Sequence, residues 1–249
     1  MQFAGVTDIG RARETNEDSY CLEELGSGGA AWLLAVADGL GAYQAGEVAS
    51  RIAIQTVRDC MERDVLDPEA AAPGGAGWSD RLRRAITAAH GRILGEASGE
   101  PGLGGMGTTL TAVVVEGTRL HWGHVGDSRA YVLRAGHLTL LTRDHSVTGR
   151  LVADGVLGEE AARQHPHRNL LTQALGMDGP IEVETGVTEL QGGDWLILTT
   201  DGLTAVVGGE EIVRSARRAD MPLALCERLV ALANARGGPD NITVIAARA

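Results

Sequence analysis

Three apolar segments of this chain lead into an aspartate or follow one directly, and this pattern limits the folds that the chain can adopt. Residues 31–37 (AWLLAVA) precede Asp38, residues 195–200 (WLILTT) precede Asp201, and Asp240 precedes the segment NITVIAA. Short apolar runs without a helical period are typical of buried strands. An unpaired buried charge is very costly, so carboxylates at such strand ends need a partner.

The pair Asp38-Gly39 has two interpretations on its own residues. Asp-Gly is a common hairpin turn, and this reading is favoured when the pair is taken alone. In the other interpretation the carboxylate binds a divalent cation, because hard cations take carboxylate oxygens, backbone carbonyls and water. The glycine would then let the backbone come close to the ion.

The composition is that of an ordinary globular protein with an acidic surface. A length of 249 residues allows one large domain or two small ones, with ample chain for a core. The hydrophobic fraction of 44% and the charged fraction of 22% are typical of soluble proteins. The net charge of −11 argues against nucleic acids and anionic membranes as main partners.

The three cysteines, Cys21, Cys60 and Cys226, lie far apart and form no CxxC pair. A structural zinc site is therefore not expected. Three free thiols favour a reducing compartment. The N-terminal segment lacks the features of a signal peptide, and no apolar run approaches the length of a membrane span. We therefore expect a cytoplasmic protein that does not bind membranes.

Hydrophobic periodicity and turn residues predict an α+β fold. We expect strands at residues 2–7, 19–23, 31–37, 108–115, 119–125, 130–134, 137–141, 181–188, 194–200 and 241–247. Helices are expected at residues 47–63, from a cap at Ser79 to a stop before Gly95, and at 210–218 and 222–235. The four strands between residues 108 and 141 are expected to form one antiparallel meander. The grouping favours two stacked sheets, each covered by a helix pair.

Further carboxylates stand in similar positions beside asparagine or glycine. Glu17 and Asp18 follow Asn16, and Asp127 follows Gly126. Converging carboxylates repel one another unless cations neutralise them, and ligands that offer only oxygen suit Mg²⁺ or Mn²⁺. A cluster that holds two such ions can activate water for hydrolysis. An arginine such as Arg13 can orient a phosphate dianion there.

Seven short motifs of the chain occur in an order that resembles the protein phosphatase 2C family of metal-dependent Ser/Thr phosphatases, in its compact bacterial form. The resemblance extends from Phe3 to about Arg248. The motifs are residues 13–18 (RETNED), 38–39 (DG), 107–109 (GTT), 126–129 (GDSR), 144–146 (DHS), 201–203 (DGL) and 238–243 (GPDNIT). Each motif alone is a weak signal, and the seven together form a strong one.

The resemblance implies a single catalytic domain over residues 1–249 with a four-layer αββα sandwich. In that fold two mainly antiparallel sheets are flanked by pairs of antiparallel helices, and the metals lie at one end. Residues 144–179 match a mobile flap beside the active site.

The resemblance also implies a role for each motif residue. Asp38 would bridge two metals, with Glu17 and the Gly39 carbonyl on one ion and Asp201 and Asp240 on the other. Asp18 would act on the second ion through water, and Arg13 would bind the substrate phosphate. Asp127, with Asp201, would help to hold a weaker third ion.

The function implied is hydrolysis of phosphoserine and phosphothreonine in proteins. A water activated by two Mn²⁺ or Mg²⁺ ions would attack phosphorus directly, without a covalent phospho-enzyme. The expected partners are phosphorylated proteins and a cognate bacterial Ser/Thr kinase, and we expect a monomer.

Three places depart from the family pattern, and one of them is residues 41–43 (GAY), where bacterial members usually have two glycines and a histidine. Leu40 stands where eukaryotic members have a histidine that is a candidate general acid, and Ala205 stands where many members have an aspartate for the third metal. The third site is therefore expected to be weak.

Other interpretations remain open at this point. Glu17, Asp18, Asp127 and Asp240 are also residues that commonly cap turns or helices, and Arg13 could be an ordinary surface arginine. A catalytically inactive relative that only binds partners, and a hydrolase of small phosphate esters, are the competing functions.

Overall fold

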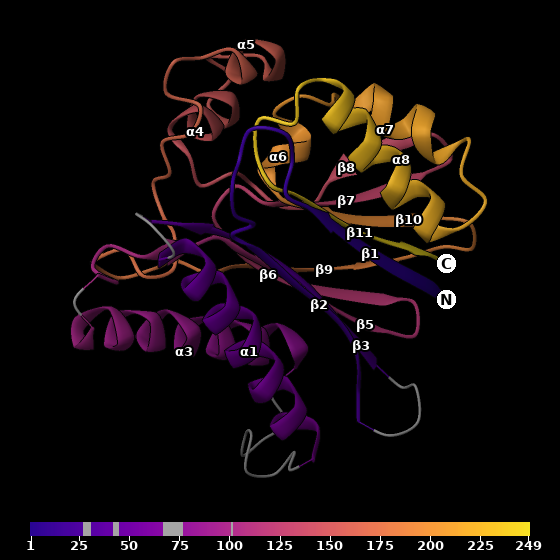
Figure 1. Ribbon diagram of the computed structural model, residues 1–249. Coiled ribbons are helices and arrows are strands. Elements are labelled where there is room, and N and C mark those ends of the chain that lie inside the picture. The colour runs from indigo at the N-terminus through magenta and orange to yellow at the C-terminus, as the bar shows by residue number, and fades with distance from the viewer. Residues whose placement is uncertain (27–30, 42–44, 67–76, 101) are drawn as a thin grey trace.

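The computed structural model describes all residues except 27–30, 42–44, 67–76 and 101. Two β-sheets lie face to face at its centre (Figure 1). The first sheet contains, in spatial order, β1 (Gln2–Asp8), β11 (Ile242–Arg248), β10 (Trp195–Thr199), β7 (Arg129–Arg134) and β8 (His137–Leu140). All neighbouring strands in it are antiparallel.

The second sheet is also antiparallel throughout. Its order is β2 (Asp18–Leu25), β3 (Ala31–Leu40), β5 (Leu110–Glu116), β6 (Arg119–Val125) and β9 (Glu184–Glu189). The short strand β4 (Gly107–Thr108) pairs with the last residues of β3.

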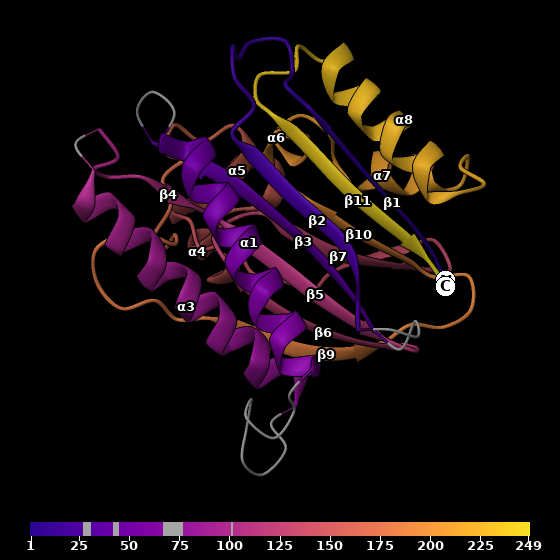
Figure 2. The same ribbon diagram turned by 60° about the horizontal axis from the view of Figure 1, so that its bottom comes forward.

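Helices cover the outer face of each sheet, which gives the four layers that the resemblance implied. The second sheet is covered by α1 (Ala45–Leu66) and α3 (Trp78–Gly99), as Figure 2 shows. The first is covered by α7 (Gly209–Ala216) and α8 (Pro222–Ala235). No helix in the described part of the chain is both long enough and apolar enough to span a bilayer.

Three short helices lie near one end of the sandwich. One is α6 (Asp201–Thr204), directly after β10. The others are α4 (Val147–Ala153) and α5 (Glu159–Arg163), which stand away from the layers in Figure 1. Both lie within residues 144–179, for which the resemblance implies a flap, and these residues are called the flap segment below.

The lack of hydrophobic alternation in β3 follows from burial on both of its faces. Leu34 and Val36 pack between the two sheets. Leu33 and Ala35 point the other way and pack in the layer with α1 and α3. Both sides of the strand are therefore apolar, which is why the sequence shows a continuous apolar run.

The predicted meander is wrong, because its four strands belong to two different sheets. β5 pairs with β6 in the second sheet, and β7 pairs with β8 in the first. The chain changes sheets at residues 126–128. Gly126 has a φ of +114°, and a Cβ there would overlap Thr109. Periodicity predicted the strands but contains no signal for the partner of each strand.

Two predicted helix boundaries near α3 are also wrong. The helix begins at Trp78 with Gly77 in the N-cap position, so Ser79 lies inside the first turn and does not cap it. At its other end the helix continues through Gly95 to Gly99. Packing of its buried face outweighs the low intrinsic helix propensity of glycine.

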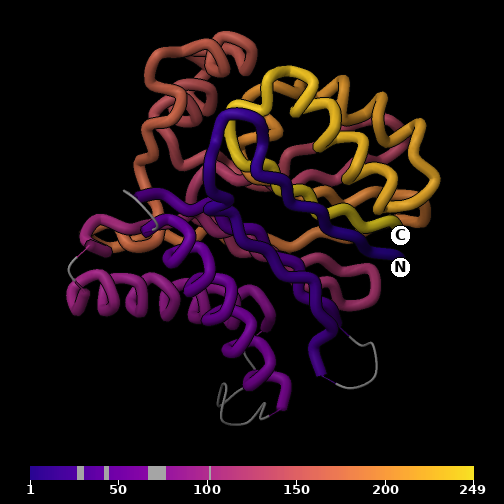
Figure 3. The backbone as a smooth tube through the Cα atoms, viewed as in Figure 1, coloured from indigo at the N-terminus to yellow at the C-terminus, as the bar shows by residue number. Residues whose placement is uncertain are grey.

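Both termini lie side by side at one end of the sandwich (Figure 3), where Gln2 pairs with Arg248. From that end β1 runs to Asp8, and β11 runs back from Ile242. Residues just after β1 and just before β11 therefore meet at the opposite end.

The sandwich interior should dominate stability. Leu34 is fully buried between the sheets, so Leu34→Ala is expected to lower the free energy of unfolding by about 2–5 kcal/mol through lost burial and a residual cavity. Leu223→Ala is the matched control, because Leu223 is 45% exposed on α8. This substitution should lower the free energy of unfolding by less than about 0.5 kcal/mol. Urea unfolding followed by circular dichroism measures both. Similar losses in the two variants would contradict this assignment of the core.

Candidate functional site

Most of the predicted site residues line one cavity of about 220 Å³ at the end of the sandwich opposite the termini. They come from four places: the β1–β2 connection, the end of β3, the β6–β7 turn, and the residues that adjoin β10 and β11. The predicted residues among the lining are Arg13, Glu17, Asp38, Gly39, Asp127, Asp201 and Asp240. Asp18 stands directly behind them, since it pairs with Asp38 across β2 and β3.

Asp38 and Gly39 are part of a strand and do not form a hairpin turn. β3 continues to Leu40, and Gly39 pairs with Thr108 of β4. The Asp38 N–H donates to Oγ1 of Thr109 at 3.0 Å. A Cβ on Gly39 would overlap the carbonyl oxygen of Gly46 in the first turn of α1, so only glycine fits there. The hairpin interpretation is therefore excluded.

Asp18 joins the two sheets by its side chain. Its Oδ2 accepts hydrogen bonds from the hydroxyls of Thr200 at 2.8 Å and Thr243 at 2.6 Å, both in the first sheet or adjoining it. Its Oδ1 is buried and has no partner among the described residues. Burial raises the pKa of Asp18 to about 7 even though the two hydroxyls lower it.

Asn241 fixes the connection that carries Arg13 and Glu17. Its Nδ2 donates to the carbonyls of Ile9 and Thr15, each at 2.9 Å. Its Oδ1 accepts from the N–H of Glu17 at 2.8 Å. The residue therefore holds an otherwise irregular loop in place, which is more than the turn role that Asn commonly has.

Arg13 supplies the only cationic side chain among the described residues that line the cavity. Its Nη2 donates to Oδ2 of Asp240 at 2.8 Å, and this hydrogen bond is the main reason that the pKa of Arg13 is raised. The Arg13 side chain is 52% exposed, so its charge also faces solvent at the mouth of the cavity.

The carboxylates of the cluster destabilise one another's charged forms. The pKa of Asp38 is raised well above its usual range, first by desolvation and then by the charges of Asp18 and Asp201. Desolvation also raises the pKa of Asp127, with repulsion from Asp201 as the next cause. The pKa of Glu17 is also raised, mainly by desolvation. Each of these groups would gain from a nearby cation.

The donor set fits hard divalent cations. All side-chain donors that face the cavity from the cluster are carboxylate oxygens, which Mg²⁺ and Mn²⁺ prefer. Oδ1 of Asp201, like Oδ1 of Asp18, is buried without a partner in the described structure. Buried oxygens of this kind normally have a donor or an ion beside them. The cluster can therefore bind cations at these oxygens, for which the described residues supply no partner.

The turn that carries Asp127 is fixed from both sides. Oγ of Ser128 hydrogen-bonds Oγ1 of Thr109 at 2.8 Å, and Thr109 also contacts Asp38 as described above. The N–H of Gly126 donates to Nδ1 of His145 at 3.2 Å. Asp38 and Asp127 are therefore placed relative to each other through Thr109.

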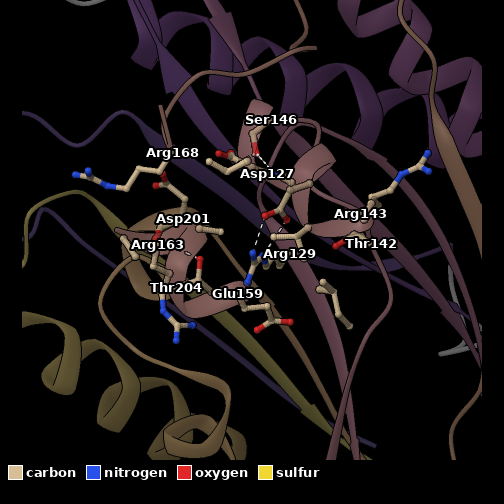
Figure 4. Close-up of a pocket in the computed structure, with 18 of the residues that line it drawn as sticks. Asp127, Arg129, Thr142, Arg143, Ser146, Glu159, Arg163, Arg168, Asp201 and Thr204 are labelled. Atoms are coloured by element: carbon tan, nitrogen blue, oxygen red, sulfur yellow. Dashed lines mark hydrogen bonds and ion pairs between the residues drawn. The ribbon is translucent and has the colours of Figure 1, made fainter. Parts of the chain in front are cut away.

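Sequence reasoning left Arg129 unassigned, and the structure pairs it with Asp144. The Arg129 Nε and Nη2 donate to the two carboxylate oxygens of Asp144 at 2.8 and 2.6 Å, and Nη1 donates to the Tyr131 hydroxyl at 3.0 Å. Figure 4 shows Arg129 beside Asp127. The pair joins β7 to the first residue of the flap segment. Nothing in the sequence marked two residues this far apart as partners.

His124, His145 and Glu184 also lie close together, with potential ligand atoms within 4.8 Å of one another. The ring nitrogens of His124 already bond Thr111 at 2.8 Å and the Arg143 carbonyl at 3.1 Å. Burial lowers the pKa of His124 to about 3, so the ring is neutral. Both histidines therefore already make hydrogen bonds within the protein.

The Arg129–Asp144 pair should contribute strongly to stability. Asp144→Ala leaves the Arg129 guanidinium mostly buried without its partner, so the free energy of unfolding should fall by about 3–5 kcal/mol. Asp154→Ala is the control, because Asp154 pairs with Arg150 at 3.9 Å and is 61% exposed; a change under about 1 kcal/mol is expected. Both are measured by urea unfolding with chelator present. Equal effects would show that the buried pair adds nothing.

The sequence matches known phosphatases over almost its whole length. A family profile described as protein phosphatase 2C matches residues 11–234. The serine/threonine phosphatase stp of Listeria monocytogenes is 37% identical over 248 residues, which cover 96% of this chain and 92% of that protein. The serine/threonine protein phosphatase PstP of Mycobacterium tuberculosis is 38% identical over 247 residues, and this chain spans 45% of its length.

Solved structures of similar proteins share the fold. The crystal structure of Mycobacterium tuberculosis PstP has a TM-score of 0.84 and 36% identity, covering 99% of this chain and 97% of that one. The PstP catalytic domain in complex with two manganese ions has a TM-score of 0.82 and 36% identity, with the same coverage. On the extent of these matches, and with the acidic cavity in the expected place, this chain belongs to the protein phosphatase 2C family.

Proposed function

We propose that this protein hydrolyses phosphoserine and phosphothreonine in proteins and requires Mn²⁺ or Mg²⁺. The observation that carries the proposal is the cavity in which acidic residues from distant segments meet beside one arginine. Oδ1 of Asp201 in the cavity and Oδ1 of Asp18 behind it have no partner among the described residues, so cations would complete the site. The PstP structure with two manganese ions supports the choice of metal.

The residues present would hold two core ions. Asp38 lies at the centre of the cluster and would bind both. Glu17 and the Gly39 carbonyl would bind one of them, and Asp201 and Asp240 the other. Asp18, which does not line the cavity, would contact the second ion through a water molecule. Bound divalent ions lower the pKa of water and neutralise charge on a phosphoryl group, which is the chemistry that hydrolysis needs.

The side chains themselves bind and orient the substrate. Arg13 is placed at the mouth of the cavity and would bind the phosphate dianion by charge-assisted hydrogen bonds. Asn241 holds the Arg13 loop in position for this contact. Leu40 also lines the cavity and has no proton to donate, so the leaving oxygen would take its proton from water or from another group of the site.

A third, weaker ion would bind between Asp127 and Asp201. These two residues also line a neighbouring cavity together with Ala205, which offers no carboxylate. Fewer anionic ligands give weaker binding of a hard cation, so this position would fill only at high metal concentration.

The remaining parts of the proposal concern the domain organisation and the cellular setting. Residues 1–249 would act as one catalytic domain, with residues 144–179 as its flap. A location in the cytoplasm is supported by three cysteines that are all free. A cognate Ser/Thr kinase would supply the phosphorylated substrates, and the enzyme would work as a monomer. The competing role of an inactive relative is disfavoured because all core carboxylates are present.

Metal dependence tests the core of the proposal. After dialysis against chelator, phosphate release from a phosphothreonine peptide should stop, and Mn²⁺ or Mg²⁺ should restore it. Asp38→Asn should reduce turnover by more than about a hundredfold. Substitution of residues that only support metal ligands already lowers metal affinity or activity by up to about that factor. It should also weaken Mn²⁺ binding measured by calorimetry.

Asp59→Asn, which alters an exposed carboxylate on α1, is the control for that variant and should behave as wild type. Full turnover in excess chelator would refute the two-ion interpretation.

The role of Arg13 has its own test. Arg13→Ala should raise KM and weaken inhibition by free phosphate together, by about 10- to 150-fold, which corresponds to the loss of about 1.5–3 kcal/mol for a bond to a charged group. Arg11→Ala, which changes a neighbouring exposed arginine that does not line the cavity, should leave both constants unchanged. An unaltered phosphate inhibition constant in Arg13→Ala would remove this residue from the site.

A further inference from the structure

A second cavity, of about 240 Å³, lies between the flap segment and the first sheet (Figure 4). It shares three lining residues with the carboxylate cavity: Asp127, Asn169 and Asp201. The two cavities therefore lie next to each other. A peptide whose phosphorylated side chain enters the first cavity would place a neighbouring residue at the entrance of the second.

Apolar side chains line this second cavity on both of its sides. Val152 and Ala153 come from α4 and Ala162 from α5, in the flap. Leu140 of β8 and Ala205 after α6 come from the body of the protein. Apolar groups that lie half-exposed in a concave site gain free energy when a ligand removes them from water.

Apart from Asp127 and Asp201, which stand in the wall shared with the carboxylate cavity, the charged residues of this cavity are paired or exposed. Arg129 is neutralised by Asp144, and Arg163 by its ion pair with Glu160. In Figure 4 the guanidinium groups of Arg143 and Arg168 point outward on opposite sides.

The remaining acidic group at the edge belongs to Glu159, which is exposed. Among the apolar side chains, away from Asp127 and Asp201, a charged ligand group would lose its hydration without gaining a partner, so that part of the cavity suits an apolar group.

We propose that this cavity binds an apolar side chain of the substrate, of the size of valine, leucine or methionine, from a residue close in sequence to the phosphorylated one. The inference rests on the proposed phosphatase function and assigns a sequence preference to it. The volume is sufficient for one such side chain, and the flap and the body of the protein would both contact it.

The preference can be measured with a series of phosphothreonine peptides. In an alanine background, leucine is placed at each neighbouring position in turn on both sides of the phosphothreonine. The kcat/KM for each peptide is determined with saturating Mn²⁺ and divided by the rate with a small aryl phosphate, which has no neighbouring residue. One position should favour leucine over alanine by about tenfold or more, as expected for an apolar pocket.

Variants of flap residues then test whether this cavity is the source of the leucine preference. Ala162→Leu fills the cavity and should bring the leucine-to-alanine ratio close to one. Val152→Asp places a carboxylate in the cavity and should reverse the preference, so that lysine becomes favoured at the same position. The gain for lysine cannot arise from misfolding. Val156→Asp is the matched control, because Val156 is also on the flap, is 68% exposed and does not line the cavity.

Each outcome bears on the proposal. Equal rates for all wild-type peptides, or a leucine preference that persists in both Ala162→Leu and Val152→Asp, would overturn it and leave the phosphatase function intact. Loss of the preference in Val156→Asp to the same degree would also overturn it. Hydrolysis of the aryl phosphate without hydrolysis of any peptide would instead contradict the proposed substrate class, and the inference with it.

Discussion

Repulsion among carboxylates that share one poorly hydrated cavity is the constraint on which the rest of this structure depends. Desolvation raises the pKa of Asp38 and Asp127 most, and the charge of Asp201 raises both further, so these carboxylates would separate if the chain allowed it. The fold resists this with neutral hydrogen bonds. Two threonine hydroxyls hold Asp18 between the sheets, and Thr109 holds both the Asp38 strand and the turn of Asp127. The protein thus keeps its acids together by geometry and leaves their charge to be balanced by ions.

The identity of the acidic residues could be read from the sequence because it follows from local rules. An apolar run that meets an aspartate, as at Asp38 and Asp201, marks a carboxylate at the end of a buried strand, and motif order connects several such points. The same local rules could not choose between a turn and a strand at Gly39. That choice depends on pairing with Thr108, about seventy residues along the chain, which no periodicity records.

Long-range partners were the part of the site that the sequence did not reveal. Asn241 holds a loop more than two hundred residues earlier, and Arg129 and Asp144 come together through the pairing of β7 with β8. Such contacts are set by which strands become neighbours, and that is decided by the packing of whole sheets. The predicted meander failed for the same reason. Side chains that position the site are therefore harder to predict than those that would perform its chemistry.

The central place of β11 has a consequence for synthesis of the protein. This strand lies between β1 and β10, so β1 has no partner in its sheet until the chain has been made as far as Arg248. The same late segment brings Asp240 and also Asn241, which fixes the early Arg13 loop. A nascent chain on the ribosome therefore lacks Asp240, and also the contacts that fix its Arg13 loop, until β11 emerges. Translation itself delays the appearance of an active enzyme until the fold can close.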